Sequence, residues 1–297
     1  MYDSFSSFHP IVNFLYFLVV LIFSMFLMHP IFQIIALISA ITYSMMIKGL
    51  RKGIKINIAY MLPMLLFMAF LNPLFNHEGV TILFYLKDGN PITFESILYG
   101  IASATMFITV IIWFSCYNAV MTSDKFIYLF GRIIPSLSLI FSMVLRFVPR
   151  YLEQIKIISN AQKSIGRDLS QGGIIKRAKN GIKILSIMTT WALENSIETA
   201  DSMRARGYGL SGRTSFSIFS FDNKDKIGVS AIILLVSIIL IGAFKGENTI
   251  KFFPSIKFSE ITEFSIFIYI VYLILCMLPV IINIQEAIRW KSIKSKI

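Results

Sequence analysis

The sequence predicts an all-α integral membrane protein with about six transmembrane helices and long cytoplasmic amphipathic helices. Hydrophobic residues make up 56% of its 297 residues, and charged residues make up only 15%. The mean hydropathy is +0.73. Soluble domains carry roughly a quarter charged residues, so this composition excludes an ordinary soluble protein. The apolar residues also gather in long runs that are separated by basic stretches.

Six apolar runs reach the roughly 17–25 residues that a transmembrane helix needs. They cover residues 11–28, 31–47, 56–75, 96–121, 227–244 and 264–284. Between the third and fourth runs, VTILFYL, KDGN and PITFE indicate either a short β-hairpin turning at Asp88-Gly89-Asn90 or an irregular loop. We expect residues 1–297 to form a single membrane domain. Its parts are four spans in 1–123, a cytoplasmic coupling-helix region in 124–226, and two spans with a tail in 227–297.

The distribution of basic residues predicts that both termini are cytoplasmic. On this topology the inner segments hold 24 Lys and Arg residues, and the outer loops hold four, namely Lys87, Lys245, Lys251 and Lys257. Cytoplasmic loops of membrane proteins carry this excess. The net charge of +12 therefore reflects membrane topology, and we expect no nucleic-acid partner.

Residues 126–148 are apolar enough to resemble a seventh span. Arg132 and Arg146 interrupt this run, and Pro135 is expected to break its helix. A span here would also place the many basic residues that follow on the outside, against the charge rule. We therefore expect helices that lie along the inner membrane face or dip into it.

Two amphipathic helices are predicted in the cytoplasmic region, over residues 150–165 after Pro149 and over residues 174–206. The second repeats mostly small residues at spacings of four and three, which predicts a seam for packing against another helix. The seam comprises Ala178, Ile182, Leu185, Thr189, Ala192, Ser196, Ala200 and Met203.

Both predicted helices end with a basic residue and then a glycine. Lys163 precedes Gly166, which we expect to cap the first helix, and Arg206 precedes Gly207. These helix ends have two interpretations. In the first, the basic residues have a structural role, because a cation near a helix C-terminus is favourable by roughly 0.3–1 kcal/mol. Alternatively, an arginine on a rigid helix end can form a bidentate pair with a carboxylate of a partner.

Three stretches of this region carry a family resemblance: LRFVPRYLEQIKIISNAQKSIG, GGIIKRAK, and ENSIETADSMRARGYG with the following Gly212-Arg213-Thr214. Over about residues 135–215 they resemble the transmembrane T component of energy-coupling-factor (ECF) importers, the EcfT/CbiQ family. That family is marked by two Ala-Arg-Gly motifs at the ends of coupling helices. Ala205-Arg206-Gly207, preceded by Arg204, matches one motif fully. Ser164-Ile165-Gly166 has Ile165 in place of the arginine, so Lys163 or Arg167 would supply the charge.

The resemblance implies an energy-coupling scaffold for the import of vitamins or metal ions, with no catalytic residues. The two helix ends would dock on two ATPase subunits, identical or different, which bind ATP and magnesium, while this chain holds no cofactor. The coupling helices, with the seam as a contact surface, would transmit ATPase motion to a small membrane substrate-binding S component. The setting implied is the cell membrane of a bacterium or archaeon. We expect Arg206 to anchor one ATPase more strongly than Lys163 or Arg167 anchors the other.

Two other function classes fit the sequence less well. The permease of an ordinary ABC importer would show an EAA-type loop, of which only Glu286-Ala287 is present. An intramembrane enzyme would place ionisable groups within the spans, where these runs have almost none. Glu194, Glu198 and Asp201 lie at spacings of four and three on the long helix, which favours a solvated face or pairing with nearby Lys and Arg over a metal or acid–base site. We expect no metal site, and the chain has no GxxxxGK[ST] phosphate loop.

Overall fold

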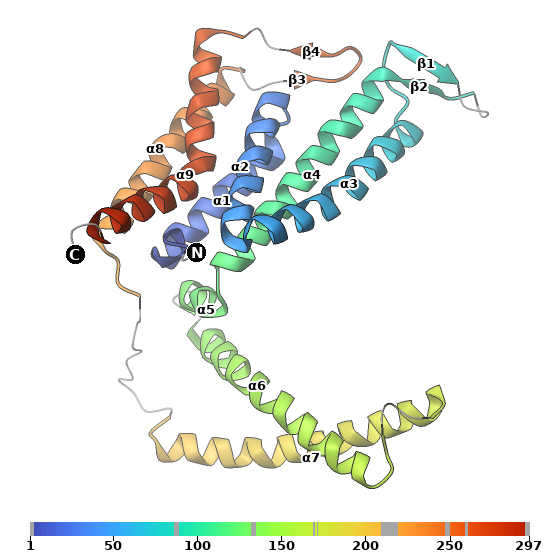
Figure 1. The fold of residues 1–297 in the computed structure, drawn as a ribbon, viewed down its shortest axis with the longest axis vertical. Coiled ribbons are helices and arrows are strands. Elements are labelled where there is room, and N and C mark those ends of the chain that lie inside the picture. The colour runs from blue at the N-terminus through green and yellow to red at the C-terminus, as the bar shows by residue number, and fades with distance from the viewer. Residues whose placement is uncertain are drawn as a thin grey trace. The chain divides into compact units, whose positions relative to one another are not determined.

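The computed structural model describes residues 3–85, 89–131, 135–168, 170, 172–208, 219–246, 250–258 and 261–294. The chain forms two compact units. Unit 1 comprises residues 1–126 and 219–297, and unit 2 comprises residues 127–218. Figure 1 shows the helices and strands of both units along the chain.

A helix of unit 1 lies at each of the six predicted spans. These helices are α1 (Pro10–Phe26), α2 (Pro30–Lys48), α3 (Leu50–Phe75), α4 (Phe94–Val120), α8 (Asn223–Phe244) and α9 (Glu263–Lys294). Within the described ranges, four of them, α2, α4, α8 and α9, are long and apolar enough to cross a membrane. The remaining two apolar stretches, α1 and the Pro63–Phe75 part of α3, are shorter. The predicted all-α membrane architecture is confirmed.

The starts of several helices follow from local sequence chemistry. Pro10 and Pro30 open α1 and α2, where a missing backbone N–H costs no hydrogen bond. The α8 helix begins with a capping box, in which Asp222 and Asp225 each accept a hydrogen bond from the other's backbone N–H. Gly49, with φ of +84°, separates α2 from α3.

The core of unit 1 is aromatic. Tyr16, Phe17, Tyr43 and Trp113 are fully buried and pack together, with Phe17 and Trp113 edge to face at a ring-centroid distance of 6.3 Å. Helix α2 contacts α3, α4 and α9, so it lies at the centre of this packing. Many outward apolar side chains are exposed, among them Phe244 at 91%. Exposed apolar surface on long apolar helices suits a lipid environment.

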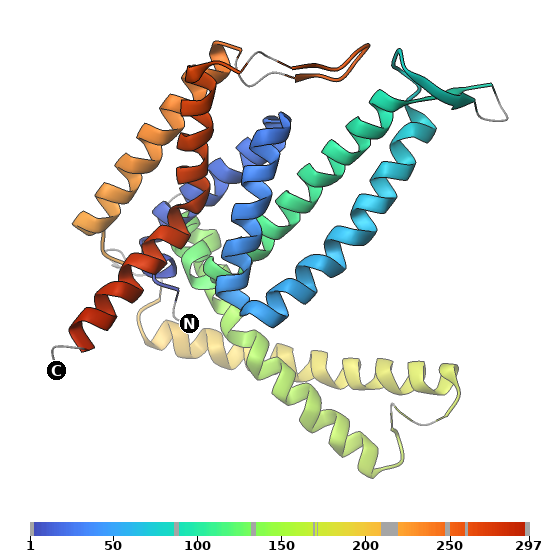
Figure 2. The ribbon, with the colours of Figure 1, turned by 45° about the horizontal axis from the view of Figure 1, so that its top comes forward.

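Two β-hairpins join helices at one end of unit 1. Strand β1 (Ile82–Tyr85) pairs with β2 (Pro91–Thr93) between α3 and α4. This confirms the hairpin interpretation, although Asp88 in its predicted turn lies outside the described residues. Strand β3 (Ile250–Lys251) pairs with β4 (Lys257–Phe258) between α8 and α9, a hairpin that was not predicted. Figure 2 shows both hairpins at the same end of the helices.

The N-terminal segment closes the opposite end of unit 1 through a buried polar network, which was not predicted. It begins with a short 3-10 turn, η1 (Phe5–Ser7). The Asp3 carboxylate accepts hydrogen bonds from Tyr43 Oη at 2.9 Å and from Asn283 Nδ2 at 2.7 Å. Asn283 Oδ1 in turn accepts from the Ser4 backbone N–H at 2.7 Å.

A second part of this network holds the start of helix α5 (Ser123–Gly131), which crosses from unit 1 into unit 2. Lys125 Nζ donates to the backbone carbonyl of Ser6 and to that of Val120, the latter at 3.1 Å. The His9 backbone N–H donates to Asp225 Oδ1 at 2.8 Å. The network therefore brings the N-terminus, the end of α2, the start of α8 and the last turns of α9 to one end of unit 1. The topology predicts the same grouping; its cytoplasmic orientation stays a prediction.

Unit 2 contains two long helices, α6 (Pro135–Ser164) and α7 (Ile174–Ala205). The predicted boundaries of α7 are confirmed. The prediction for the first helix was wrong at its start, because α6 begins at Pro135 and continues through Pro149. A proline inside a helix removes one backbone hydrogen bond and bends the helix, but residues on both sides can remain helical. Within the described ranges, α6 is not among the helices long and apolar enough to span a membrane.

Candidate docking site: the ends of helices α6 and α7

Helix α6 ends in a Schellman motif, in which a left-handed residue allows two backbone hydrogen bonds to close the last turn. Gly166 has φ of +78°. The Gly166 N–H donates to the Lys163 carbonyl at 3.0 Å, and the Arg167 N–H donates to the Gln162 carbonyl at 2.9 Å. Gly166 is thus the predicted cap. We name residues 162–168 tip 1.

Helix α7 ends in the same motif. Gly207 has φ of +80°. Its N–H donates to the Arg204 carbonyl at 2.9 Å, and the Tyr208 N–H donates to the Met203 carbonyl at 3.0 Å. We name residues 203–208 tip 2. The resemblance at Gly212, Arg213 and Thr214 lies outside the described residues.

The shared motif sets a residue-by-residue correspondence between the tips. Counting from the left-handed glycine, Lys163 matches Arg204, Ser164 matches Ala205, and Ile165 matches Arg206. Arg167 matches Tyr208. Ile165 therefore occupies the position of the predicted anchoring arginine, and neither Lys163 nor Arg167 does.

The cations of tip 1 have partners within the tip. Lys163 Nζ lies 3.6 Å from Asp168 Oδ2, and Arg167 Nη1 donates to Gln162 Oε1 at 3.5 Å. Hydrogen bonds from Ser170, together with the charge of Lys163, lower the pKa of the Asp168 carboxyl. That carboxylate therefore remains charged and available to pair with Lys163 at neutral pH.

A backbone contact joins tip 1 to the neighbouring helix. Asn180 Nδ2, on α7, donates to the Asp168 carbonyl at 3.1 Å. Neither Asp168 nor Asn180 was predicted as a site residue, because a local helix pattern carries no sign of a contact across a loop. The Asp168 side chain thus pairs with Lys163 while its carbonyl binds α7, which fixes the loop that carries the tip.

Tip 2 presents its cations differently. The side chains of Arg204 and Arg206 are both exposed. Within residues 172–208 and the other described ranges, neither guanidinium has a hydrogen bond or an ion pair, in contrast to Lys163. An exposed guanidinium can pair with a carboxylate through two hydrogen bonds.

Helices α6 and α7 pack through a compact cluster that supports both tips. Ile158 of α6 is buried against Ile184 and Met188 of α7. At one side, Trp191 meets Tyr151 edge to face at a centroid distance of 5.6 Å, and the Arg150 guanidinium lies 5.7 Å from the Trp191 ring. This packing holds the two helices as one body within unit 2.

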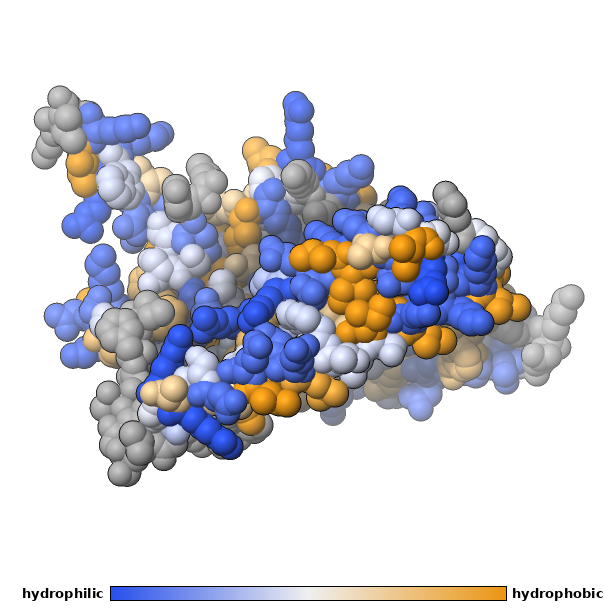
Figure 3. Space-filling model, turned by 90° about the horizontal axis from the view of Figure 1, so that it is seen from below, coloured by the Kyte–Doolittle hydropathy of each residue, from blue (hydrophilic) through white to orange (hydrophobic). Residues whose placement is uncertain are grey.

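The predicted seam of α7 is not the face that packs on α6. Most of its residues are exposed, with Ile182 at 68% and Leu185 at 62%, and Ala192 and Met203 are half-buried. The exposed members are Ala178, Ile182, Leu185, Thr189, Ser196 and Ala200. Figure 3 shows one face of the molecule, where apolar patches lie directly beside hydrophilic side chains. The seam remains a predicted contact surface for another protein or for lipid.

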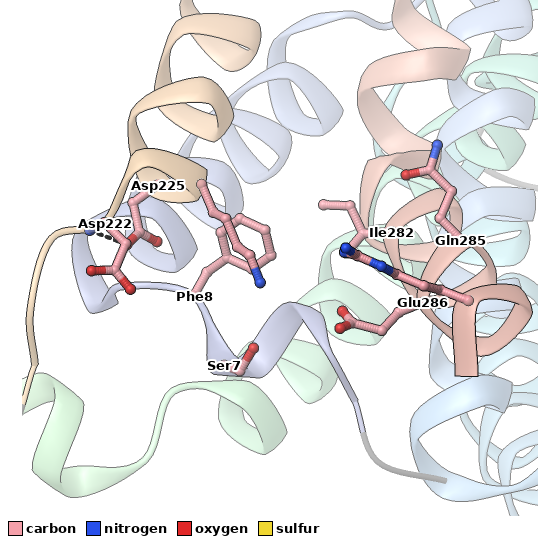
Figure 4. A pocket seen from close by; sticks show the side chains of 9 residues that line it. Ser7, Phe8, Asp222, Asp225, Ile282, Gln285 and Glu286 are labelled. Atoms are coloured by element: carbon pink, nitrogen blue, oxygen red, sulfur yellow. Dashed lines mark hydrogen bonds between the residues drawn. The ribbon is translucent and has the colours of Figure 1, made fainter. Parts of the chain in front are cut away.

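Unit 1 has a separate polar cavity of about 550 Å³ at the end that the N-terminal segment closes. Figure 4 shows Asp222 and Asp225 on one side of it and Gln285 and Glu286 of α9 on the other. Lys224 and Arg289 also line it, so it mixes both charges. In the part of the chain that the structure describes, no group of three or more His, Cys, Asp or Glu side chains is placed to hold a metal ion.

A family model described as cobalt transport protein, CbiQ, matches residues 4–217, which include both tips. The chain belongs to the CbiQ family. This confirms the predicted EcfT/CbiQ resemblance and makes the chain a multi-pass membrane protein of a transport family. The match reaches well beyond the motifs around the tips, because it also includes α1 to α4 of unit 1.

Curated relatives carry the name energy-coupling factor transporter transmembrane protein EcfT. The protein from Lactobacillus helveticus (strain DPC 4571) is 38% identical over 109 residues, which cover 36% of this CbiQ-family chain and 39% of the relative. That from Leuconostoc gelidum subsp. gasicomitatum is 37% identical over 112 residues, covering 37% and 42%. That from Brevibacillus brevis is 34% identical over 113 residues, covering 38% and 42%. The chain thus matches about two fifths of the length of these relatives.

Proposed function

We propose that this chain is the energy-coupling transmembrane subunit of an ECF-type importer for vitamins or metal ions. The family membership and the names of the relatives support this assignment. In this role the chain is not an enzyme. Partner ATPases would bind ATP and magnesium, and a separate small S component would bind the substrate.

The observation that carries the proposal is the pair of matched helix ends. Two long helices of one body end in the same rigid turn, and one of them carries Arg206 at an exposed position. A guanidinium on such a turn can form a bidentate pair with a carboxylate, and the fixed backbone sets the direction in which its side chain leaves the helix. The tips thus have the form of two docking points with the same backbone turn.

The packing between the helices supports a mechanical role. The cluster of Ile158, Ile184 and Met188 ties α6 to α7, so a displacement at one tip is passed to the other helix. The exposed seam of α7 would then carry that displacement to the S component. A flexible loop would dissipate the same motion, whereas a packed helix pair transmits it.

Co-purification tests the assignment. The tagged chain is expressed with the ATPase subunits of the same organism, and the ATPases retained on the chain are measured. We expect Arg206→Glu to reduce retention strongly, because it reverses the charge that faces the proposed carboxylate. Lys179→Glu, at an exposed position of the same helix α7, is the matched control and should retain the ATPases. Equal retention by the two variants, or no ATPase on the unaltered chain, contradicts the proposal.

A further inference from the structure

Tip 1 carries the apolar residue Ile165 at the position where tip 2 carries the cation Arg206. The two Schellman motifs place Ile165 and Arg206 one residue before the left-handed glycine. Ile165 is 61% exposed, although an isoleucine gains from burial. In the proposed function this turn lies against an ATPase, so docking would bury Ile165.

The neighbouring cations already have partners within tip 1. Lys163 pairs with Asp168 across the turn, and Arg167 is half-buried and donates to Gln162. Both belong to positions other than that of Ile165 in the motif. Their interactions hold the turn in shape, and the ion pair reduces the net positive charge that tip 1 presents.

We propose that tip 1 docks by inserting Ile165 into an apolar pocket of an ATPase subunit, whereas tip 2 docks by pairing Arg206 with a carboxylate. This inference rests on the proposed function and adds the chemistry of each partner surface. It assigns Lys163, Arg167 and Asp168 a positioning role, and it replaces our expectation that Lys163 or Arg167 supplies an anchoring charge.

The two contacts then differ in their response to salt. An ion pair at a surface weakens as ionic strength rises, because mobile ions screen it. Burial of an isoleucine is not weakened in this way, and sulfate strengthens apolar contacts. Raising the salt concentration should therefore release the tip 2 contact first and leave the tip 1 contact in place.

The experiment measures the ratio of ATPase to chain after co-purification of the full-length chain, at low and high NaCl. Ile165→Asp should lower retention at tip 1 by about tenfold or more, because it places a charge in the apolar pocket. Ile165→Leu, which keeps an apolar side chain of equal size, should retain the ATPase. Lys163→Gln should change retention less than Ile165→Asp does. Because the proposal assigns different partner surfaces to the two tips, the loss should appear in the ATPase that contacts tip 1.

Other outcomes separate failure of this inference from failure of the proposed function. If the unaltered chain retains ATPase and Lys163→Gln releases it while Ile165→Asp does not, the apolar contact is wrong and the coupling role stands. If Ile165→Arg strengthens binding and makes it salt-sensitive, the pocket is acidic and the inference is overturned. If the unaltered chain retains no ATPase, both fail. Unchanged hydrogen exchange in α6 and α7 shows that a variant keeps the fold of unit 2.

Discussion

Gly166 and Gly207 adopt the same left-handed conformation, with φ of +78° and +80°, one residue beyond Ile165 and Arg206. Each glycine lets the chain turn back so that two backbone N–H groups reach carbonyls of the last helical turn. A residue with a Cβ pays a conformational penalty of roughly 1–2 kcal/mol in this region. The form of both tips therefore depends on glycine at these positions.

The first prediction concerns these two turns. Gly166→Ala should destabilise tip 1 by about 1 kcal/mol, although no atom within 4 Å would obstruct the added methyl group. Hydrogen exchange at the Gly166 and Arg167 amides should become faster, and ATPase retention should fall. Gly207→Ala should have the same effect at tip 2.

The control for these variants is Gly173→Ala, at the start of α7. Gly173 has φ of −65°, and an added methyl group there also meets no atom within 4 Å. This variant therefore replaces a glycine that does not adopt the left-handed conformation. If the tip amides exchange no faster in the Gly166→Ala and Gly207→Ala variants than in the Gly173→Ala variant, the turns do not need glycine.

The second prediction concerns Trp191, which joins α7 to α6 by contacts with Tyr151 and Arg150. Trp191→Leu removes an edge-to-face aromatic contact and a cation–π contact, together worth about 1–2 kcal/mol. Hydrogen exchange along both helices should become faster. Trp290→Leu, at a 65% exposed position on α9, is the control and should leave those rates unchanged. Unchanged hydrogen exchange in the Trp191→Leu variant would mean that other contacts hold α6 against α7.

The third prediction concerns the close approach of α8 and α9 in unit 1. A Cβ at Gly242 would lie 2.2 Å from Ile268 Cδ1 and 3.0 Å from its Cγ1. Gly242→Ala should lower the thermal stability in detergent by overpacking, by about 1–3 kcal/mol. Adding Ile268→Val removes the Cδ1 atom and should restore much of the loss.

Gly228→Ala on the same helix is the matched control for this prediction. There the added methyl group would make an ordinary contact of 3.4 Å with Val12 Cγ1. We expect a small effect or a slight gain, because alanine favours helix over glycine by about 1 kcal/mol. A Gly242→Ala variant as stable as Gly228→Ala would contradict the observed helix packing.

The fourth prediction concerns Lys125, which ties the N-terminal segment to the start of α5. Lys125→Met keeps most of the side-chain length and removes the donors to the Ser6 and Val120 carbonyls. Loss of charged hydrogen bonds of this kind should lower the stability of unit 1 by about 1.5–3 kcal/mol in thermal unfolding. Lys226→Met, at an exposed position of α8, should change it little. Equal melting temperatures for the two variants would show that the hydrogen bonds of Lys125 do not stabilise unit 1.

Features that depend on a few neighbouring residues could be predicted from the sequence. The length of α7 from Ile174 follows the helical period of its apolar residues. Gly166 and Gly207 end α6 and α7, as a glycine after the last helical residue predicts. The start of α6 could not be placed, because Pro149 costs one hydrogen bond without forcing the helix to end. The β3–β4 hairpin was missed because two-residue strands are too short to show an alternating pattern.

Features that depend on distant residues could not be read from local patterns. Asp3, Tyr43 and Asn283 meet although they are far apart in the chain. The face of α7 that packs on α6 contains Ile184 and Met188, next to the predicted seam, because larger side chains there fill the contact. The motif alone places Ile165 where the arginine belongs, whereas the partners of Lys163 and Arg167 could be seen only in the structure.

Cysteine cross-linking at the tips tests whether both tips lie against ATPase subunits. Both native cysteines, Cys116 and Cys276, are buried, so an introduced surface cysteine can be modified selectively. Ser164→Cys and Ala205→Cys place thiols at equivalent exposed positions beside Ile165 and Arg206, and Thr190→Cys is an exposed control in the middle of α7. With a short cross-linker in membranes, we predict that both tip variants join to an ATPase subunit and that Thr190→Cys does not. Cross-linking at Thr190→Cys with none at either tip would contradict docking through the tips.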